Sequence, residues 1–246
     1  YIDKLSQTSE EFYNELTNNP IHPQTSQPTP GDFRRQYQYL KSHYDSIISI
    51  HIPQQMSGTY QSAMSASKRV DNAKITVIDG LSASVGLGLI VMEMAKLAKD
   101  GKSKEEIEKS LFKIISSTNV FIVVKDLSYA VKGGRLPQWV KKIADIFHIR
   151  PILSIKDYGK IGVSGVIKGT VDLPEKMNKF ILSKMDNDKS YNISIGHSNN
   201  SVDGEKMKEL IQKGHSRINA IHLMDIGCAM GVHTGPGSIA VAIQPA

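Results

Sequence analysis

Apolar positions in the first half of the chain follow two different periods. Short apolar runs at residues 45–50, 75–78 and 120–124 are typical of buried strands. The segments between them have apolar residues three and four positions apart, which predicts amphipathic helices. Strands that alternate with helices of this length predict a mainly parallel sheet covered on both faces. Ligands of such sheets gather at the carboxyl ends of the strands.

Capping signals mark several helix starts. Thr8 and Ser103 are each followed three residues later by a glutamate, which is the spacing of a capping box. Residues 29–32 combine a threonine cap, a proline at the first helical position and an aspartate in the first turn, and the predicted helix runs to about Lys41. Residues 86–99 are apolar on nearly every side, so we expect a buried helix there.

The regular alternation of predicted strands and helices ends at about Lys125. A hairpin is predicted around the turn at residues 157–159, and the helices and strands that follow no longer alternate as regularly. The fold class we expect is α/β with two domains. Residues 1–125 should form a three-layer α/β domain around a parallel sheet, and residues 126–246 a smaller α+β domain, with the ligand site between them.

Composition narrows the function classes. The 246 residues are 40% hydrophobic and 22% charged, with no apolar run long enough for stable membrane insertion and no charged-then-apolar leader. One cysteine, Cys228, cannot form an internal disulfide, and a reducing cytoplasm fits best. The net charge is +6, but the basic residues form no long cluster and the aromatics do not interleave with them. Nucleic-acid binding is therefore a minor alternative, and an anionic small ligand explains the charge as well.

The sequence contains no strong cofactor or metal motif. Residues 84–88 begin like a dinucleotide-binding fingerprint, but Val91 stands where the third glycine belongs. The chain has no phosphate-binding loop of the Gly-x-x-x-x-Gly-Lys-Ser/Thr type and no Cys/His pair with zinc spacing. We therefore expect neither a cofactor nor a metal ion.

The candidate ligand site begins where the strand ending near residue 50 gives way to a loop. That loop delivers Ser57, Gly58 and Thr59 to the start of a predicted helix. A helix start has backbone N–H groups without intrahelical partners and a partial positive charge, so it favours an anion. Thr25 and Ser26 add two hydroxyls in a segment that prolines restrict. Together these residues are candidate donors to a carboxylate.

Two further motifs extend this site. The glycine turn at residues 132–135 carries two cations and could hold an anion, and His233 precedes a glycine-rich bend. A serine hydrolase or acyltransferase built from Ser57, His233 and Asp79 is the alternative from another class. Ser57 lacks the Gly-x-Ser-x-Gly elbow, which counts against it.

In this combination and order the motifs resemble those of the DegV family of bacterial fatty-acid-binding proteins. The matching motifs are Thr25–Pro28, Pro30–Phe33, Ser57–Ala63, Val77–Asp79, Ser82–Ser84, Gly86–Gly88, Lys132–Leu136, Arg150–Leu153 and His233–Gly237. Each is weak alone, but the ordered set spans nearly the whole chain. The family's usual opening strand and its Asp-Ser/Thr-rich loop are absent here, so we expect the parallel sheet to lack one strand.

The resemblance implies a long-chain fatty acid between the two domains. By this similarity Thr25 and Ser57 hydrogen-bond the carboxylate, while His233 and Arg135 support them. Lys168 stands near the position of a family arginine, and lysine cannot supply that arginine's bidentate fork. The acyl chain would need a long apolar tunnel, for which residues 87–97 and 120–124 are candidates.

The resemblance also implies a partner. Family members present the bound fatty acid to the catalytic subunit of a fatty acid kinase, which converts the carboxylate to an acyl phosphate for phospholipid metabolism. By this similarity the chain is a non-catalytic carrier subunit that shields the acyl chain and exposes its head.

Overall fold

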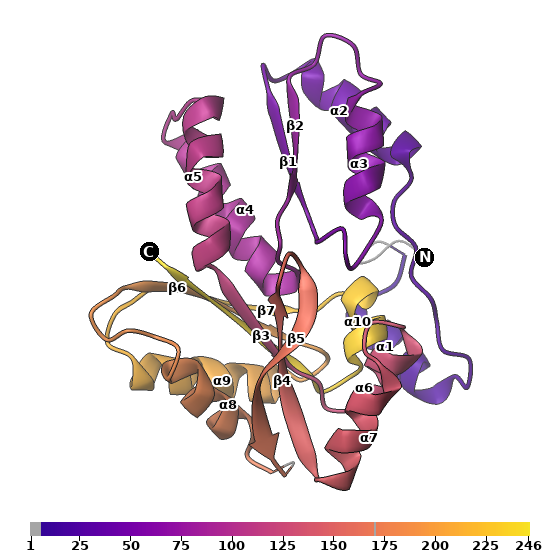
Figure 1. Ribbon diagram of the computed structural model, residues 1–246, viewed down its shortest axis with the longest axis vertical. Helices are drawn as coiled ribbons and strands as arrows, with labels where there is room; N and C mark the ends of the chain where they lie inside the picture. Colours follow the sequence, from indigo (N-terminus) through magenta and orange to yellow (C-terminus); the bar gives the residue numbers. More distant parts are fainter. Residues whose placement is uncertain (1–5, 170) are drawn as a thin grey trace.

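The computed structural model describes residues 6–169 and 171–246 as a mixed α/β protein built around two sheets (Figure 1). The helices are α1 (Ser9–Asn18), α2 (Pro30–Lys41), α3 (Thr59–Ser67), α4 (Ser84–Lys99), α5 (Lys104–Ser117), α6 (Leu127–Lys132), α7 (Gln138–Ile146), α8 (Leu173–Leu182), α9 (Ser201–Gly214) and α10 (Cys228–Thr234). The strands are β1 (Ile47–His51), β2 (Ile75–Asp79), β3 (Asn119–Val123), β4 (Ile149–Lys156), β5 (Lys160–Lys168), β6 (Tyr191–His197), β7 (Ile218–Asp225) and β8 (Ile239–Pro245).

The smaller sheet is the parallel pair β1 and β2, with Ile47 opposite Ile75 and His51 opposite Asp79. On one face α2 and α3 bury a cluster that includes Tyr37 and Ala63. On the other face the apolar sides of α4 and α5 pack against the strands. These three layers are the arrangement that the alternating pattern predicts, and they are visible in the upper half of Figure 1.

The larger sheet has the strand order β5-β4-β3-β8-β6-β7, in which β6 and β7 are parallel and the other neighbours antiparallel. Helices α8 and α9 cover one face and enclose the largest apolar cluster, which includes Met177 and Met207. This part of the chain contains six of the described strands. Its β3 strand, expected in the first domain, pairs with β4 and β8, so the two sheets divide before Asn119.

Helix α4 joins the two sheets. Its Val85 and Leu89 pack against Val120 and the small β8 residues facing them, while its other side packs on α5 and the small sheet. The helix is not buried all round as expected, because Val91 and Met92 are exposed. The helix has apolar residues on more than one side because it packs against two partners. Its N-terminal part contacts the large sheet, and Ile90 and Met94 contact α5 and the small sheet.

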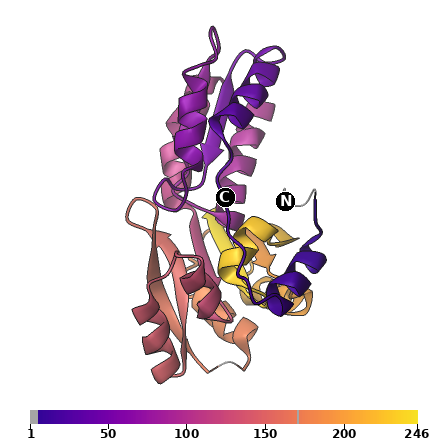
Figure 2. The same ribbon diagram turned by 90° about the vertical axis from the view of Figure 1, so that its right-hand side faces the viewer.

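The first helix packs on the opposite end of the molecule from α2. Phe12, Tyr13 and Leu16 of α1 form a cluster with Val232 of α10, and the Tyr13 hydroxyl donates to the carbonyl of Ile226 at 3.1 Å. The chain then crosses from the large sheet to α2, along the edge seen in Figure 2. This crossing segment carries Thr25 past the junction of the two sheets.

Candidate functional site

The loop that follows β1 is held in place by the end of β2. Met56 and Ser57 both donate backbone N–H bonds to the carbonyl of Pro53, at 2.9 and 3.2 Å. The Asp79 carboxylate accepts backbone N–H bonds from Gln54 at 3.2 Å and from Leu81 at 3.0 Å. Asp79 therefore fixes the loop that presents Ser57, a structural role that its position alone did not predict.

Ser57 lies one residue before the N-cap of α3. The cap is Gly58 and not Ser57, which corrects the position expected for the serine. The Ser57 hydroxyl lies 2.9 Å from the Thr59 hydroxyl and accepts the Thr59 backbone N–H at 3.3 Å. A cluster of two hydroxyls and a helix N-terminus can donate several hydrogen bonds to an anion.

The segment with Thr25 and Ser26 approaches this helix start. A Cβ on Gly58 would lie 2.7 Å from the amide nitrogen of Gln27, so the glycine lets that side chain rest on the cap. Thr25 is partly buried, whereas Ser26 and Gln27 are exposed. The two segments of the predicted carboxylate site thus meet through Gln27, a contact that the sequence reasoning did not identify.

His233 anchors Thr25 from the other side. Its Nε2 lies 3.1 Å from Thr25 Oγ1, and Nδ1 has no described hydrogen-bond partner. Burial, with smaller contributions from Arg135 and His22, lowers the pKa of His233 from 6.5 to about 4, so the ring is neutral at pH 7. A Cβ on Gly133 would overlap Nδ1, so this glycine makes room for the ring.

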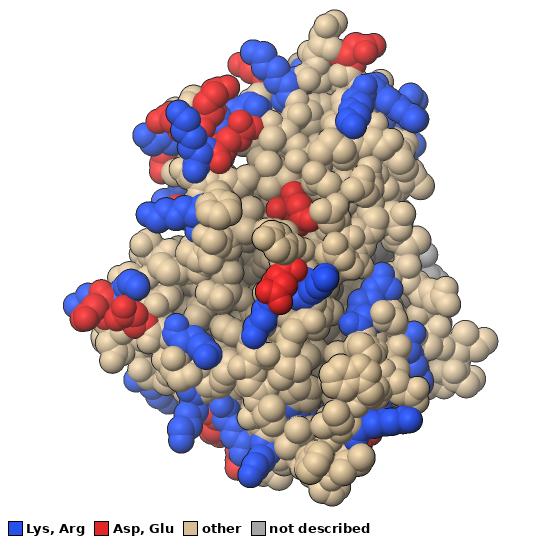
Figure 3. Space-filling model, viewed as in Figure 1, with Lys and Arg blue, Asp and Glu red and all other residues tan. Residues whose placement is uncertain are grey.

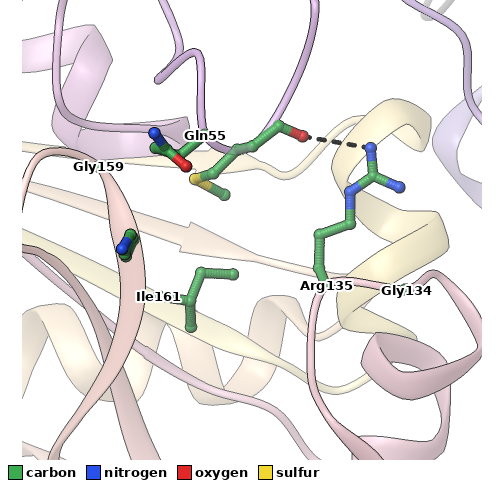
Figure 4. Close-up of a pocket in the computed structure, with 7 residues that line it drawn as sticks. Gln55, Gly134, Arg135, Gly159 and Ile161 are labelled. Atoms are coloured by element: carbon green, nitrogen blue, oxygen red, sulfur yellow. Dashed lines mark hydrogen bonds between the residues drawn. The ribbon is translucent and has the colours of Figure 1, made fainter.

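Arg135 connects the glycine turn after α6 to the loop of residues 52–58, which contains Ser57 and which we call the serine loop. Its guanidinium donates to the carbonyl of Gly133 at 2.8 Å and to the carbonyl of Met56 at 3.2 Å, the second of which is drawn in Figure 4. Gly134 has a φ of 71°, a conformation that favours glycine and allows the turn. The structure therefore brings Thr25, Ser57 with its loop, Arg135 and His233 to one region.

Lys168 does not reach this region. It lies at the far end of β5, opposite Ile149, whereas Lys160 at the near end lines a cavity next to Met56. The two lysines are eight residue steps apart along the strand, about 26 Å at 3.3 Å per step. The sequence match near a family arginine placed Lys168 in the site because a one-dimensional match cannot show which end of a strand faces a ligand.

The hydrolase triad of the alternative hypothesis is not assembled in this structure. His233 pairs with Thr25 rather than with Ser57, and Asp79 is engaged by backbone N–H groups of its own neighbourhood. Nδ1 of His197 lies 3.1 Å from the Asp225 carboxylate. The geometry presents Ser57 as a hydrogen-bonding group.

The described residues hold neither a metal cluster nor a membrane-spanning helix. No group of three or more His, Cys, Asp or Glu side chains in residues 6–169 and 171–246 could hold a metal ion. In the same ranges no helix combines the length and the apolar character that crossing a membrane demands. Basic and acidic side chains are interspersed on the face shown in Figure 3, which is not the long basic footprint expected of a nucleic-acid surface.

The fold and the site together define an α/β protein with two sheets, in which two hydroxyl-bearing segments meet at the start of α3. A family model for DegV, a family described as uncharacterised proteins, matches residues 1–246, and the chain belongs to the DegV family. A DegV domain-containing protein from Staphylococcus aureus strain COL is 31% identical over 243 residues, covering 99% of this chain and 86% of that protein.

Solved structures agree on the fold. A DegV family protein from Thermus thermophilus, described by its fatty acid binding, superposes with a TM-score of 0.91 at 24% identity, covering 100% of this chain and 87% of that one. A fatty acid binding DegV family protein from Streptococcus agalactiae superposes with a TM-score of 0.87 at 26% identity over the same shares. The expected family and the two-domain α/β class are thus confirmed.

Proposed function

We propose that this chain binds a long-chain fatty acid, buries the acyl chain between its two sheets and presents the carboxylate at Ser57 and Thr25. The observation that carries the proposal is the convergence of two hydroxyl-bearing segments, one of them held by a neutral histidine, at a helix start. Relatives described as fatty acid binding support it. Ser26, Gly58 and Thr59 complete the proposed carboxylate site.

The proposed path of the acyl chain lies between α4 and the large sheet. Alternate residues of β8 face opposite sides, and those facing α4 are the small Ala240 and Ala242, whereas Ile239 and Val241 face α8 and α9. Val85 and Leu89 of α4 pack on these two alanines in this structure, and the proposed acyl chain would take the place of those contacts. Each CH₂ of an acyl chain buried there contributes about 0.8 kcal/mol.

We further propose that the chain is a non-catalytic subunit that serves a cytoplasmic kinase. The kinase would transfer the γ-phosphoryl group of ATP to a carboxylate oxygen: a new P–O bond forms, the bond to the bridging oxygen breaks, and ADP leaves. The role of this chain is to exclude water from the tail and to hold the head in reach. Support for this step comes from the exposed position of Arg135 beside the site.

The proposal is tested by the ligand itself. Native mass spectrometry of protein purified from bacteria should show a mass increment of one fatty acid, and an organic extract should contain it. Protein that carries no lipid and also fails to bind added fatty acid would refute the proposal.

The site assignment is tested separately by Ser57→Ala. We expect this substitution to weaken fatty acid binding about tenfold or more, because a donor to a charged group is lost. Ser67→Ala, which removes a hydroxyl bonded to Met64 in the same helix, is the matched control and should leave affinity unchanged. Equal affinities for the two variants would contradict the assignment.

A further inference from the structure

Ser194, in the middle of β6, has a buried hydroxyl without a hydrogen-bond partner among the described residues. The residue is 1% exposed, and its Oγ is shielded from solvent. A buried hydroxyl that makes no hydrogen bond destabilises the fold, so such groups are few in native proteins. Ser154, on β4 of the same sheet, is also buried, but its hydroxyl is paired with that of Ser164. The unpaired Oγ of Ser194 is therefore a candidate for contact with a ligand.

The alternation of side chains along β6 places this hydroxyl on the face of the large sheet that α4 covers. Ile193 and Ile195 belong to the apolar cluster beneath α8 and α9, so Ser194 between them faces the other way. Its direct neighbour on β8 is Ala242, which packs with the apolar residues of α4. A Cβ on Gly196, two residues along β6, would lie 2.9 Å from a side chain of the same helix. Ser194 therefore lies on the surface along which the acyl chain is proposed to run.

Ser194 is remote from the proposed carboxylate site. Ser198, just after β6, has its hydroxyl 3.1 Å from that of Thr234, the residue that follows His233. Ser194 is four residue steps further along the strand, about 13 Å at 3.3 Å per step. A long-chain acid bound by its head would therefore present its acyl chain, and not its carboxylate, at this depth.

Two other polar side chains lie on this face of the sheet. Gln244, two residues after Ala242 on β8, is buried and donates to the Thr118 hydroxyl at 2.7 Å, so it is paired within the protein. His222, the neighbour of Ser194 on β7, is partly buried, and its ring can donate or accept a hydrogen bond. A polar group of a ligand that reaches Ser194 would therefore lie next to a second hydrogen-bonding side chain.

We propose that Ser194 makes the site selective for acyl chains that carry an oxygen, as a hydroxyl or a carbonyl group, at the depth of this serine. The inference rests on the proposed function. The serine hydroxyl can donate to either kind of oxygen, and it can also accept from a ligand hydroxyl. A plain hydrocarbon chain would leave Oγ buried and unpaired. For the same reason, sites built to hydrogen-bond a substrate hydroxyl discriminate strongly against the analogue without it.

The ligand comparison uses displacement of a fluorescent fatty acid. It compares stearic acid with two series of derivatives, which carry either a hydroxyl or a methyl group at successive positions of the chain. At the position that meets Ser194, wild-type protein should bind the hydroxy acid about fivefold or more tighter than the methyl acid, because the two differ little in size but only one forms hydrogen bonds. At the other positions the methyl acid should bind tighter, because a hydroxyl buried without a partner is penalised.

Variants then test whether this preference comes from Ser194. Ser194→Ala should remove the preference and still bind stearic acid at least as tightly as the wild type. Ser194→Cys keeps a side chain of similar shape with a weak donor, and it should reduce the preference. The matched control is Ser154→Ala, which removes a buried hydroxyl on the opposite face of the same sheet and should keep the preference.

The outcomes separate this inference from the proposed function. Loss of the preference in both Ser194 variants, with the control unchanged, supports the inference. A wild-type protein that prefers no hydroxy acid over its methyl counterpart overturns it, even where stearic acid binds tightly and the proposed function stands. A preference that survives in Ser194→Ala overturns it as well. Failure of every acid to bind overturns the proposed function, and the inference with it.

Discussion

Thr25→Val tests the hydrogen bond that Thr25 is proposed to donate to the carboxylate. Valine keeps nearly the shape of threonine and removes only the hydroxyl. Thr25 Oγ1 lies 3.1 Å from His233 Nε2, and the ring is neutral because burial, above all, lowers its pKa to about 4. When Nε2 carries the ring's proton, it donates to Oγ1, and the threonine O–H is then free to donate to a carboxylate.

The expected size of the effect follows from this arrangement. A hydrogen bond to a charged group contributes about 1.5–3 kcal/mol. At about 1.4 kcal/mol per tenfold, Thr25→Val should weaken fatty acid binding about 10- to 150-fold. The valine also leaves His233 Nε2 without its partner, but this cost is present in the free and bound protein alike. It should appear as a loss of about 1 kcal/mol in the free energy of unfolding.

Two measurements separate these effects: displacement of a fluorescent fatty acid at pH 7.5 and urea unfolding of the free protein. Thr17→Val is the matched control, because it removes a hydroxyl that donates at 2.8 Å to the carbonyl of Tyr13 on α1, away from the site. The control should keep full affinity. If Thr25→Val binds fatty acid within threefold of the wild type, the assigned role of Thr25 is wrong.

Three further outcomes are expected. The folded protein holds the pKa of His233 at about 4, below the ordinary 6.5, so the unfolded chain takes up the proton first and stability is lost as pH falls from about 6.5 to 4. Because the ring is partly exposed, solvent screening reduces this loss to about 1–2 kcal/mol. Urea unfolding at pH 7 and 4 should show a loss that is smaller by this amount in His233→Gln than in the wild type, because His22 and His51, whose pKa values are also lowered, remain in both. Gly133→Ala should push the His233 ring away from Thr25 and weaken fatty acid binding at least tenfold in a displacement assay, whereas Gly88→Ala, with open space around it, should not. A fluorophosphonate probe should leave Ser57 unlabelled by peptide mass spectrometry, and a covalent adduct there would revive the hydrolase hypothesis.

Local signals in the sequence predicted the elements well where one segment carries all the information. The capping boxes at Thr8 and Ser103 are present with both reciprocal hydrogen bonds, and α2 runs from Pro30 to Lys41 as its cap and proline indicate. These contacts span three residues, so neighbouring side chains decide them. The short helices α6 and α10 were missed because six or seven residues contain too little periodicity to distinguish a helix from a turn.

Strand pairing, register and long-range hydrogen bonds could not be predicted, because each depends on residues in a distant segment of the chain. An apolar run such as β3 pairs equally well with either sheet, and only its contacts with β4 and β8 decide which. The register of β5 places Lys160 at the site and Lys168 far from it, although both are lysines on one strand. The same limitation concealed the contact of Asp79 with Gln54 and that of Gln27 with Gly58, because each joins two segments that are far apart in the sequence.

The roles of His233 and Ser57 depend on which hydroxyl the histidine ring contacts. A nucleophilic serine needs a base within hydrogen-bonding distance, and His233 Nε2 is already engaged with Thr25. Ser57 is instead bonded to Thr59, whose hydroxyl and backbone N–H hold it at the start of α3. Moving the histidine to Ser57 would strip Thr25 of its partner and require the ring to leave the space that Gly133 provides. On the proposed function, the contacts that would orient the two hydroxyls toward a carboxylate are therefore the same contacts that engage His233 with Thr25 rather than with Ser57.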